Sequence, residues 1–242
     1  MDVLVLCSLE SPPEVIRQTP LSKDETTVLK QCESIKRHRE VSVSRRLMRY
    51  ALQKHMQRSV RPLSWHRNGP RYQDGKSSLG LSIAHSKHFA AVALSDFGEI
   101  GVDVECADVS VSWRKIMLNV FNESDINWII GQNGESSDVE TKQRFLAIWT
   151  AREAYSKFYR RSIFNCLYHP RLNHACNTGV HNNDLNIDVM VDSAWVSAVC
   201  RRKSAVRMES RIACYDLSFD DISRQPGFVF SIKDDDAFYN TD

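Results

Sequence analysis

The chain has 242 residues, 42% hydrophobic and 26% charged, with a formal net charge of +2. This is the composition of a globular protein with room for two subdomains, and its charge predicts no nucleic-acid partner and no membrane partner. No apolar run approaches the ~20 residues of a membrane span, and the N-terminus lacks the charge pattern of a signal peptide. Seven cysteines without C-x-x-C pairs favour reduced thiols and a cytoplasmic location.

The first third of the chain is expected to contain one strand and two helices. Met1 to Cys7 alternates and predicts a strand. Ser22, with Glu25 three residues later, forms a candidate capping box for a helix running towards Cys32. Val41 to Gln53 carries one apolar stripe and predicts a second helix.

Basic residues gather at the start of that second helix and along it. Such a charge run is usually a solvated face, but guanidinium groups also offer bidentate contacts to phosphate. The cluster consists of Lys36, Arg37, His38, Arg39, Arg45, Arg46 and Arg49.

Further along, the pattern predicts a hairpin, a helical segment and further strands. Phe89–Leu94 and Glu99–Glu105 are expected to pair around the turn at Ser95–Gly98. Trp113 to Ile130 looks helical. The remaining strand predictions are an antiparallel pair, Leu185–Val191 with Ala194–Cys200, and one or two strands within Val206–Asp216.

Two acids share one face of the strand that ends at Glu105. Ile100, Val102 and Val104 alternate with polar positions, so Asp103 and Glu105 project together, roughly 7 Å apart at about 3.4 Å per residue. Carboxylates that close repel each other unless a cation lies between them or one is protonated. Oxygen ligands of this kind suit a hard ion such as Mg²⁺.

A second polar line lies on a predicted helix from Thr141 to Tyr159. Trp149, Glu153 and Lys157 are each four residues apart and therefore lie along one side of the helix. Taken alone, Glu153 and Lys157 would be an ordinary surface pair worth a few tenths of a kcal/mol.

Together these two segments resemble a known family. Gly101–Glu105 reads G-V-D-V-E, and Trp149–Lys157 reads W-T-A-R-E-A-Y-S-K. The pair is similar to the signature of the 4′-phosphopantetheinyl transferases, and the length resembles the monomeric surfactin-synthetase-associated type. The resemblance implies an α/β (α+β) fold, a pseudo-dimer of two similar halves, each a small antiparallel sheet packed with helices. The halves would span residues 1–98 and 99–242, with the active site in the cleft between them.

The resemblance also implies the roles of particular residues. Asp103, Glu105 and Glu153 would hold Mg²⁺, with Mn²⁺ as the alternative ion. Glu153 or a water would be the base, and Lys157 would meet the transferring phosphate. The groups implied to contact coenzyme A are Lys36, Arg39, Arg45, Arg71, His85, Ser86 and Lys157.

The chain departs from the family pattern at two places. The usual G-(K/R)-P is replaced by Gly69-Pro70-Arg71, where Arg71 offers the cation. The segment Leu81–Ser86 stands for N-(I/L/F)-S-H-S, with Ala84 in place of the usual Ser before His85. A hydroxyl that would donate to a coenzyme A phosphate is therefore absent.

The implied activity is transfer of the 4′-phosphopantetheine arm of coenzyme A to a serine of an acidic carrier protein, with release of 3′,5′-ADP. The enzyme would be a monomer. Two alternatives remain open, a metal-dependent phosphohydrolase or nuclease and an inactive carrier-binding module. The sequence does not identify the carrier or its pathway.

Overall fold

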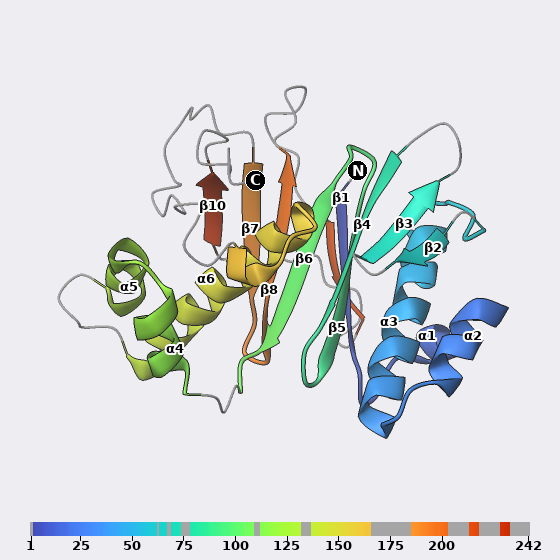
Figure 1. Cartoon of the computed structure of the whole chain (residues 1–242), viewed down its shortest axis with the longest axis horizontal. Helices are drawn as coiled ribbons and strands as arrows, with labels where there is room; N and C mark the ends of the chain where they lie inside the picture. Colours follow the sequence, from blue (N-terminus) through green and yellow to red (C-terminus); the bar gives the residue numbers. More distant parts are fainter. Residues whose placement is uncertain are drawn as a thin grey trace.

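The computed structural model describes residues 2–61, 63–66, 69–73, 78–108, 112–131, 137–165, 185–202, 213–217 and 228–232. It is a mixed α+β structure in which two sheets pack against helices, as expected (Figure 1). The helices are α1 Glu14–Gln18, α2 Lys23–Lys30, α3 Ile35–Lys54, α4 Trp113–Val120, α5 Glu123–Ile130 and α6 Asp138–Phe158, with a short 3-10 helix at Ile163–Asn165. The strands are β1 Asp2–Ser8, β2 Leu63–His66, β3 Gly69–Gln73, β4 Ser78–His85, β5 Phe89–Ser95, β6 Ile100–Cys106, β7 Leu185–Val191, β8 Trp195–Arg202, β9 Ala213–Asp216 and β10 Phe228–Ile232.

Each sheet has a simple order. The first runs β2-β3-β4-β5-β1-β9, and the second runs β10-β7-β8-β6. All pairs are antiparallel except β1 with β9, which is parallel. The expected pair of β7 with β8 is confirmed. Strand β9 comes from the C-terminal part of the chain but joins the first sheet, so the sheets do not follow the chain order throughout.

Alternation along β1 explains how the first sheet buries both faces. Val3 and Val5 point into the core beneath α3, whereas Leu4 and Leu6 point into a core shared with the second sheet. These side chains have no measurable exposure. Since successive side chains of a strand face opposite ways, one apolar strand can serve two cores.

The buried apolar residues that the structure describes form three clusters, which hold the helices and the two sheets together. One lies between α3 and the first sheet, and one lies between α6 and the second sheet. The third joins the two sheets and includes Val102 and Val104 of β6. In Figure 1, α3 and α6 lie at opposite sides, with β4 and β6 between them.

The predicted hairpin of β5 with β6 is wrong. The turn after Ser95 exists, but β5 pairs with β1 and β4, and β6 pairs with β8. The turn carries the chain from one sheet to the other. Gly98 has a φ of 109°, a backbone conformation that residues with a side chain rarely adopt. The chain also passes close to Gly80 here, since a Cβ on Gly80 would lie 1.7 Å from the carbonyl oxygen of Gly98. Local alternation shows that two strands exist but does not select their partners.

Two helices differ from the expected bounds. The predicted helix over 113–130 is two helices, because the chain breaks at Phe121–Asn122 and the Asn122 side chain caps α5 by accepting from Asp125 N at 2.9 Å. Helix α3 begins at Ile35, where the Ser34 hydroxyl accepts from Arg37 N at 3.1 Å. The basic run that follows Ile35 therefore lies in the helix itself. The capping box of Ser22 and Glu25 at α2 is confirmed.

Two further observations concern the whole described chain. No helix among the described residues is long and apolar enough to cross a bilayer. Within the same ranges, five cysteines carry free thiols: Cys7, Cys32, Cys106, Cys200 and Cys214.

Candidate active site

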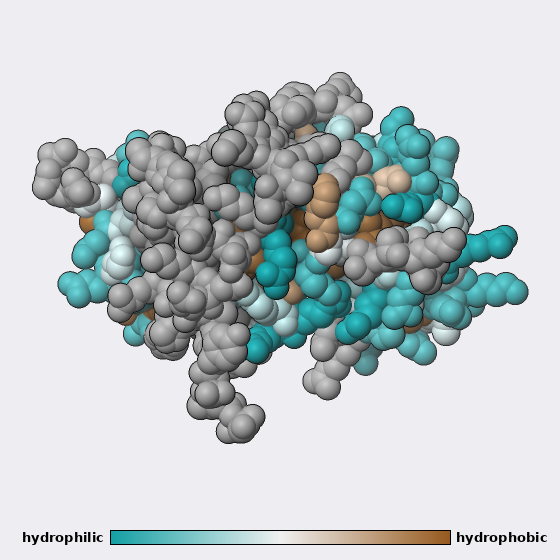
Figure 2. All heavy atoms as spheres, turned by 90° about the horizontal axis from the view of Figure 1, so that it is seen from above, coloured by the Kyte–Doolittle hydropathy of each residue, from teal (hydrophilic) through white to brown (hydrophobic). Residues whose placement is uncertain are grey.

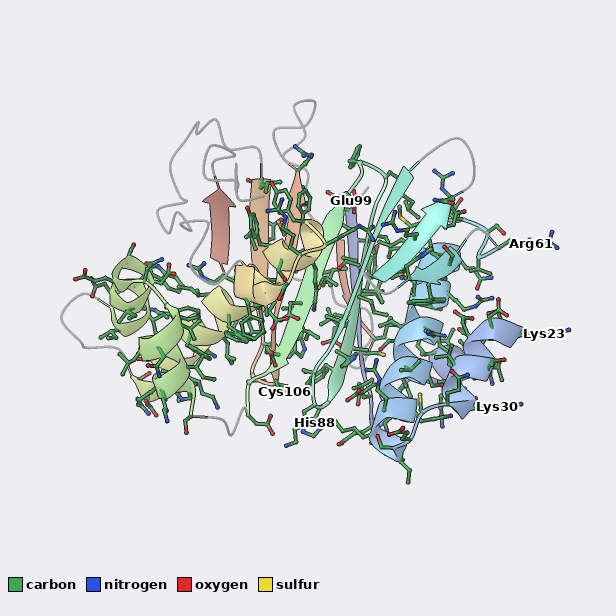
Figure 3. The ribbon with its side chains drawn as sticks, in the orientation of Figure 1. Lys23, Lys30, Arg61, His88, Glu99 and Cys106 are labelled. Carbon is green, nitrogen blue, oxygen red and sulfur yellow. The ribbon has the colours of Figure 1, made fainter. Side chains whose placement is uncertain are left out.

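Strand β6 and helix α6 approach each other closely because β6 has a glycine on the helix side. A Cβ on Gly101 would lie 1.9 Å from the carbonyl oxygen of Ala154 and 2.5 Å from the amide nitrogen of Phe158. The odd positions of β6 face α6, so Asp103 and Glu105 point the same way as Gly101. Figure 3 labels Glu99, the residue just before this strand, and Cys106, its last residue.

Lys157 connects the helix to the strand. Its Nζ donates to Asp103 Oδ1 at 2.7 Å and lies 3.8 Å from Glu153 Oε2. Asp103 is buried, while 31% of the Lys157 side chain remains exposed. The two motif segments recognised in the sequence thus meet at one point.

The carboxyl of Glu105 lies in the same group. It accepts a hydrogen bond of 3.2 Å from Trp149 Nε1, one of the residues in the polar line on α6. Burial raises the pKa of Glu105 to about 7, and the charges of Asp103 and Glu153 act in the same direction. Burial and the charge of Asp103 likewise raise the pKa of Glu153 to about 7. The three acids therefore repel one another, which the spacing along the strand had predicted for Asp103 and Glu105.

The central ion pair responds to burial and to charge. Burial raises the pKa of Asp103, although Lys157 opposes that shift. Burial acts to lower the pKa of Lys157, but attraction by Asp103 and Glu153 outweighs it, so that pKa is raised. Lys157 is therefore a firmly charged ammonium group at neutral pH.

The carboxylate oxygens of Asp103, Glu105 and Glu153 are the type of ligand that a hard cation prefers, but their positions do not form a metal site. Asp103 Oδ2 is buried and has no hydrogen-bond partner among the described residues, so one oxygen is available as a ligand. Within those residues, however, no three His, Cys, Asp or Glu side chains gather closely enough to hold a metal ion as they stand.

A cavity of about 380 Å³ opens beside Lys157. Its walls come from Gly69, Pro70 and the middle of β4 on one side and from the end of α6 on the other: Leu81, Ser82, Ile83, Lys157, Arg160, Arg161 and Ser162. Gly69 and Pro70 line this cavity, whereas Arg71, which is exposed on β3, is not among its lining residues. Viewed from above, hydrophobic atoms reach the surface in the middle of the molecule between hydrophilic groups (Figure 2).

His85 lies on the α3 side of the site. Arg37 Nη1 is 3.1 Å from His85 Nε2 and 3.2 Å from Glu40 Oε2. Burial lowers the pKa of His85, and the nearby charges of Arg37 and Lys157 add to this against the opposite effect of Glu40. The ring is therefore neutral at pH 7, and it lies close enough to Lys157 for that charge to lower its pKa.

The basic residues of α3 point in different directions. Arg45 stacks over Trp65 at 4.7 Å and, with Arg37, lines a cavity of about 500 Å³. Lys36 is largely exposed, 3.9 Å from Glu40 Oε1. Arg39 lines a separate cavity of about 400 Å³ between α1 and α3. Positions 37, 41 and 45 are four apart and share one side of the helix, whereas position 39 lies on another.

The segment around His85 corrects one expectation. Ala84 is buried in the apolar cluster between the two sheets, so a hydroxyl at this position would lie within that cluster, away from solvent. Ser86 is half-buried, and its Oγ lies 3.2 Å from Cys106 Sγ at the end of β6.

Arg152, in the middle of the second motif, has a structural partner. Its guanidinium forms a buried ion pair with Asp125 of α5. Both side chains are almost fully inaccessible. The pair fixes α5 against α6, which explains why a basic residue stands beside Glu153 without facing the site.

Three residues contact the predicted site residues without having been assigned a role there: Arg37, Glu40 and Trp149. Trp149 had been placed on the polar line of α6. Arg37 was visible within the basic run, and its spacing of eight residues from Arg45, about two helical turns, was the available signal. Glu40 carried no signal, because an acid in a basic run reads as a surface pair.

Comparison with known proteins agrees with this site. Residues 99–192 match the family model of the 4′-phosphopantetheinyl transferase superfamily. The resemblance seen in the two motifs is thereby confirmed.

Two relatives are similar to this chain over a segment about as long as the one that matches the family model. The 4′-phosphopantetheinyl transferase AcpT of Escherichia coli O157:H7 is 32% identical over 85 residues, which is 34% of this chain and 40% of that protein. AcpT of Escherichia coli strain K12 is 33% identical over 82 residues, 33% of this chain and 38% of that protein. The match thus spans about two fifths of the length of these relatives.

Proposed function

We propose that this protein is a 4′-phosphopantetheinyl transferase. It transfers the 4′-phosphopantetheine arm of coenzyme A to a serine hydroxyl of an apo carrier protein and releases 3′,5′-ADP. The observation that carries the proposal is the meeting of Asp103, Glu105 and Glu153 with Lys157 between β6 and α6. This group lies inside the segment that matches the superfamily.

The acids supply the metal site of the proposal. Mg²⁺, or Mn²⁺, would neutralise charge on the diphosphate of coenzyme A, and Asp103, Glu105 and Glu153 are the residues that would hold it. The unpartnered Oδ2 of Asp103 and the mutual repulsion of the acids support this assignment.

In the proposed reaction Glu153 accepts the proton of the serine, and Lys157 contacts the transferring phosphate. Glu153, whose pKa is about 7, accepts the proton of the attacking serine. Lys157 remains charged and partly exposed, so it can donate to the transferring phosphate and stabilise the charge that develops there. A water beside Glu153 is the alternative base.

The remaining phosphate of coenzyme A, on the 3′ position, lies along α3. Arg37 and Arg45 line one cavity there, Lys36 is exposed nearby, and His85 contacts Arg37. Arg39 faces the other cavity, and its contribution to coenzyme A binding is expected to be smaller.

The proposal includes the architecture that the resemblance implied. The two sheets with α3 and α6 form a pseudo-dimer of the monomeric surfactin-synthetase-associated type, and substrate binds in the cleft between the halves. Val102 N of β6 donates to Ser82 Oγ of β4 at 3.0 Å, so the halves meet at these two strands. The carrier is an acidic protein, and the enzyme works in the cytoplasm.

Intact-mass measurement tests this function. Apo carrier protein incubated with the enzyme, coenzyme A and Mg²⁺ should gain the mass of one phosphopantetheine arm, and a carrier lacking its serine should not. Hydrolysis of coenzyme A without carrier modification would indicate a phosphohydrolase instead. Carrier binding without any mass change would indicate an inactive binding module.

A further inference from the structure

An acid lies among the basic groups that the proposed function assigns to phosphate binding. Glu40 is only 8% exposed, and it projects from α3 towards the end of β4. An acid beside a phosphate site opposes the ligand by charge alone. Its presence therefore requires another explanation.

The contacts of Glu40 supply one. Its Oε2 accepts from Arg37 Nη1 at 3.2 Å and lies 3.9 Å from His85 Nδ1, while its Oε1 lies 3.9 Å from Lys36 Nζ. Of these neighbours, Arg37 is 55% exposed and Lys36 is 74% exposed. Because Glu40 is buried, its carboxylate is held in place by packing. The exposed side chains of Arg37 and Lys36 are long and flexible, so they are ordered by their contact with it.

The same contacts define the state of His85. A guanidinium group only donates, so His85 Nε2 accepts from Arg37 at 3.1 Å and the ring proton lies on Nδ1, the side of Glu40. Arg37 is thus held from two sides, by a carboxylate and by an imidazole nitrogen. A guanidinium has five N–H donors, so further donors remain for the cavity that Arg37 lines with Arg45.

We propose that Glu40 is a positioning residue, which together with His85 holds the Arg37 guanidinium in the orientation that binds a phosphate of coenzyme A. The inference rests on the proposed function. Holding a long side chain before the ligand arrives reduces the conformational entropy lost on binding. In this arrangement Glu40 and His85 act on the ligand through Arg37.

A double-mutant cycle tests this assignment. Glu40→Gln removes the charge but keeps the size, and it should raise the KM for coenzyme A about three- to tenfold with little change in kcat. Arg37→Ala should raise it at least as much. In the Arg37→Ala background, Glu40→Gln should then add almost nothing, because the group it positions is gone.

The control is Glu33→Gln, which removes one negative charge at the edge of the same cavity. This variant should not raise the KM for coenzyme A, because it removes a negative charge without removing a contact to Arg37. It therefore distinguishes a long-range effect of charge from the positioning of Arg37. Unfolding temperatures of all variants check that α3 remains folded.

Three outcomes would overturn the inference. A lower KM in Glu40→Gln would mean that the acid only opposes the ligand. Additive effects of the two substitutions would mean that Glu40 has a general structural role. Failure of the wild-type protein to bind coenzyme A in a calorimetric titration would overturn the proposed function together with this inference.

Discussion

Lys157 Nζ lies 2.7 Å from Asp103 Oδ1 and joins two residues 54 positions apart in the chain. The pair ties the first motif, on β6, to the second motif, on α6. It also leaves the other oxygen of Asp103 buried and without a hydrogen-bond partner among the described residues. On the proposed function, this contact aligns the metal-binding acid with the cation that meets the phosphate.

Asp103→Asn is expected to lower kcat for transfer by at least about 100-fold, the usual effect of removing one group that stabilises charge in the transition state. The amide oxygen still accepts from Lys157, so the unfolding temperature should change little. Asp96→Asn provides the control, because Asp96 is exposed and pairs with Arg58. Turnover near the wild-type rate in Asp103→Asn would remove this residue from the mechanism.

Mg²⁺ should stabilise the wild-type protein against thermal unfolding. Binding at a hundredfold excess over Kd contributes about 2.7 kcal/mol to the free energy of unfolding. Glu153→Gln should lose most of this stabilisation, because it removes one of the proposed ligands. An equal Mg²⁺ effect in both proteins would place the ion elsewhere.

Stability should depend on pH through Glu105. Its pKa rises from 4.5 to about 7 on folding, so the folded state binds the proton more tightly than the unfolded state. The free energy of unfolding therefore loses this contribution as pH rises from about 4.5 to about 7. Glu105→Gln should match wild type near pH 4.5 and be more stable above pH 7, measured by denaturant unfolding without divalent ions. A constant difference across that range would contradict the raised pKa.

The basic residues of α3 should differ in their effect on coenzyme A. Arg45→Ala should raise its KM about tenfold or more, the value of one lost charge-assisted contact. Arg39→Ala should have a much smaller effect, because Arg39 lines the cavity between α1 and α3. The two variants make the same change of charge on the same helix, so each serves as the control for the other. Equal increases would place both residues at the nucleotide.

Gly101→Ala should destabilise the protein and impair the site. The added methyl group would meet backbone atoms of Ala154 and Phe158, which cannot turn aside as a flexible side chain can. We expect a loss of about 1–3 kcal/mol in the free energy of unfolding, typical of overpacking. Ala91→Gly on β5 provides the comparison for the general cost of exchanging glycine and alanine at a buried strand position. Wild-type stability in Gly101→Ala would show that α6 can move away from β6.

The sequence by itself determined the local features of the protein. Alternation defined β6 and placed Asp103 beside Glu105, and the four-residue step placed Trp149, Glu153 and Lys157 on one side of α6. The capping box of Ser22 with Glu25 was also predictable, since it depends on residues three apart. These features follow from the periods of the strand and the helix, which operate over a few residues.

Only the tertiary structure decided which distant groups meet. The partners of β5 and β6 depend on the apolar core between the sheets and not on the turn that joins them. Ala84 faces that core because of the direction of β4, and Arg37 meets His85 because α3 packs against the same sheet. Such contacts join residues far apart in the chain, and their selection is a property of packing that no local period contains.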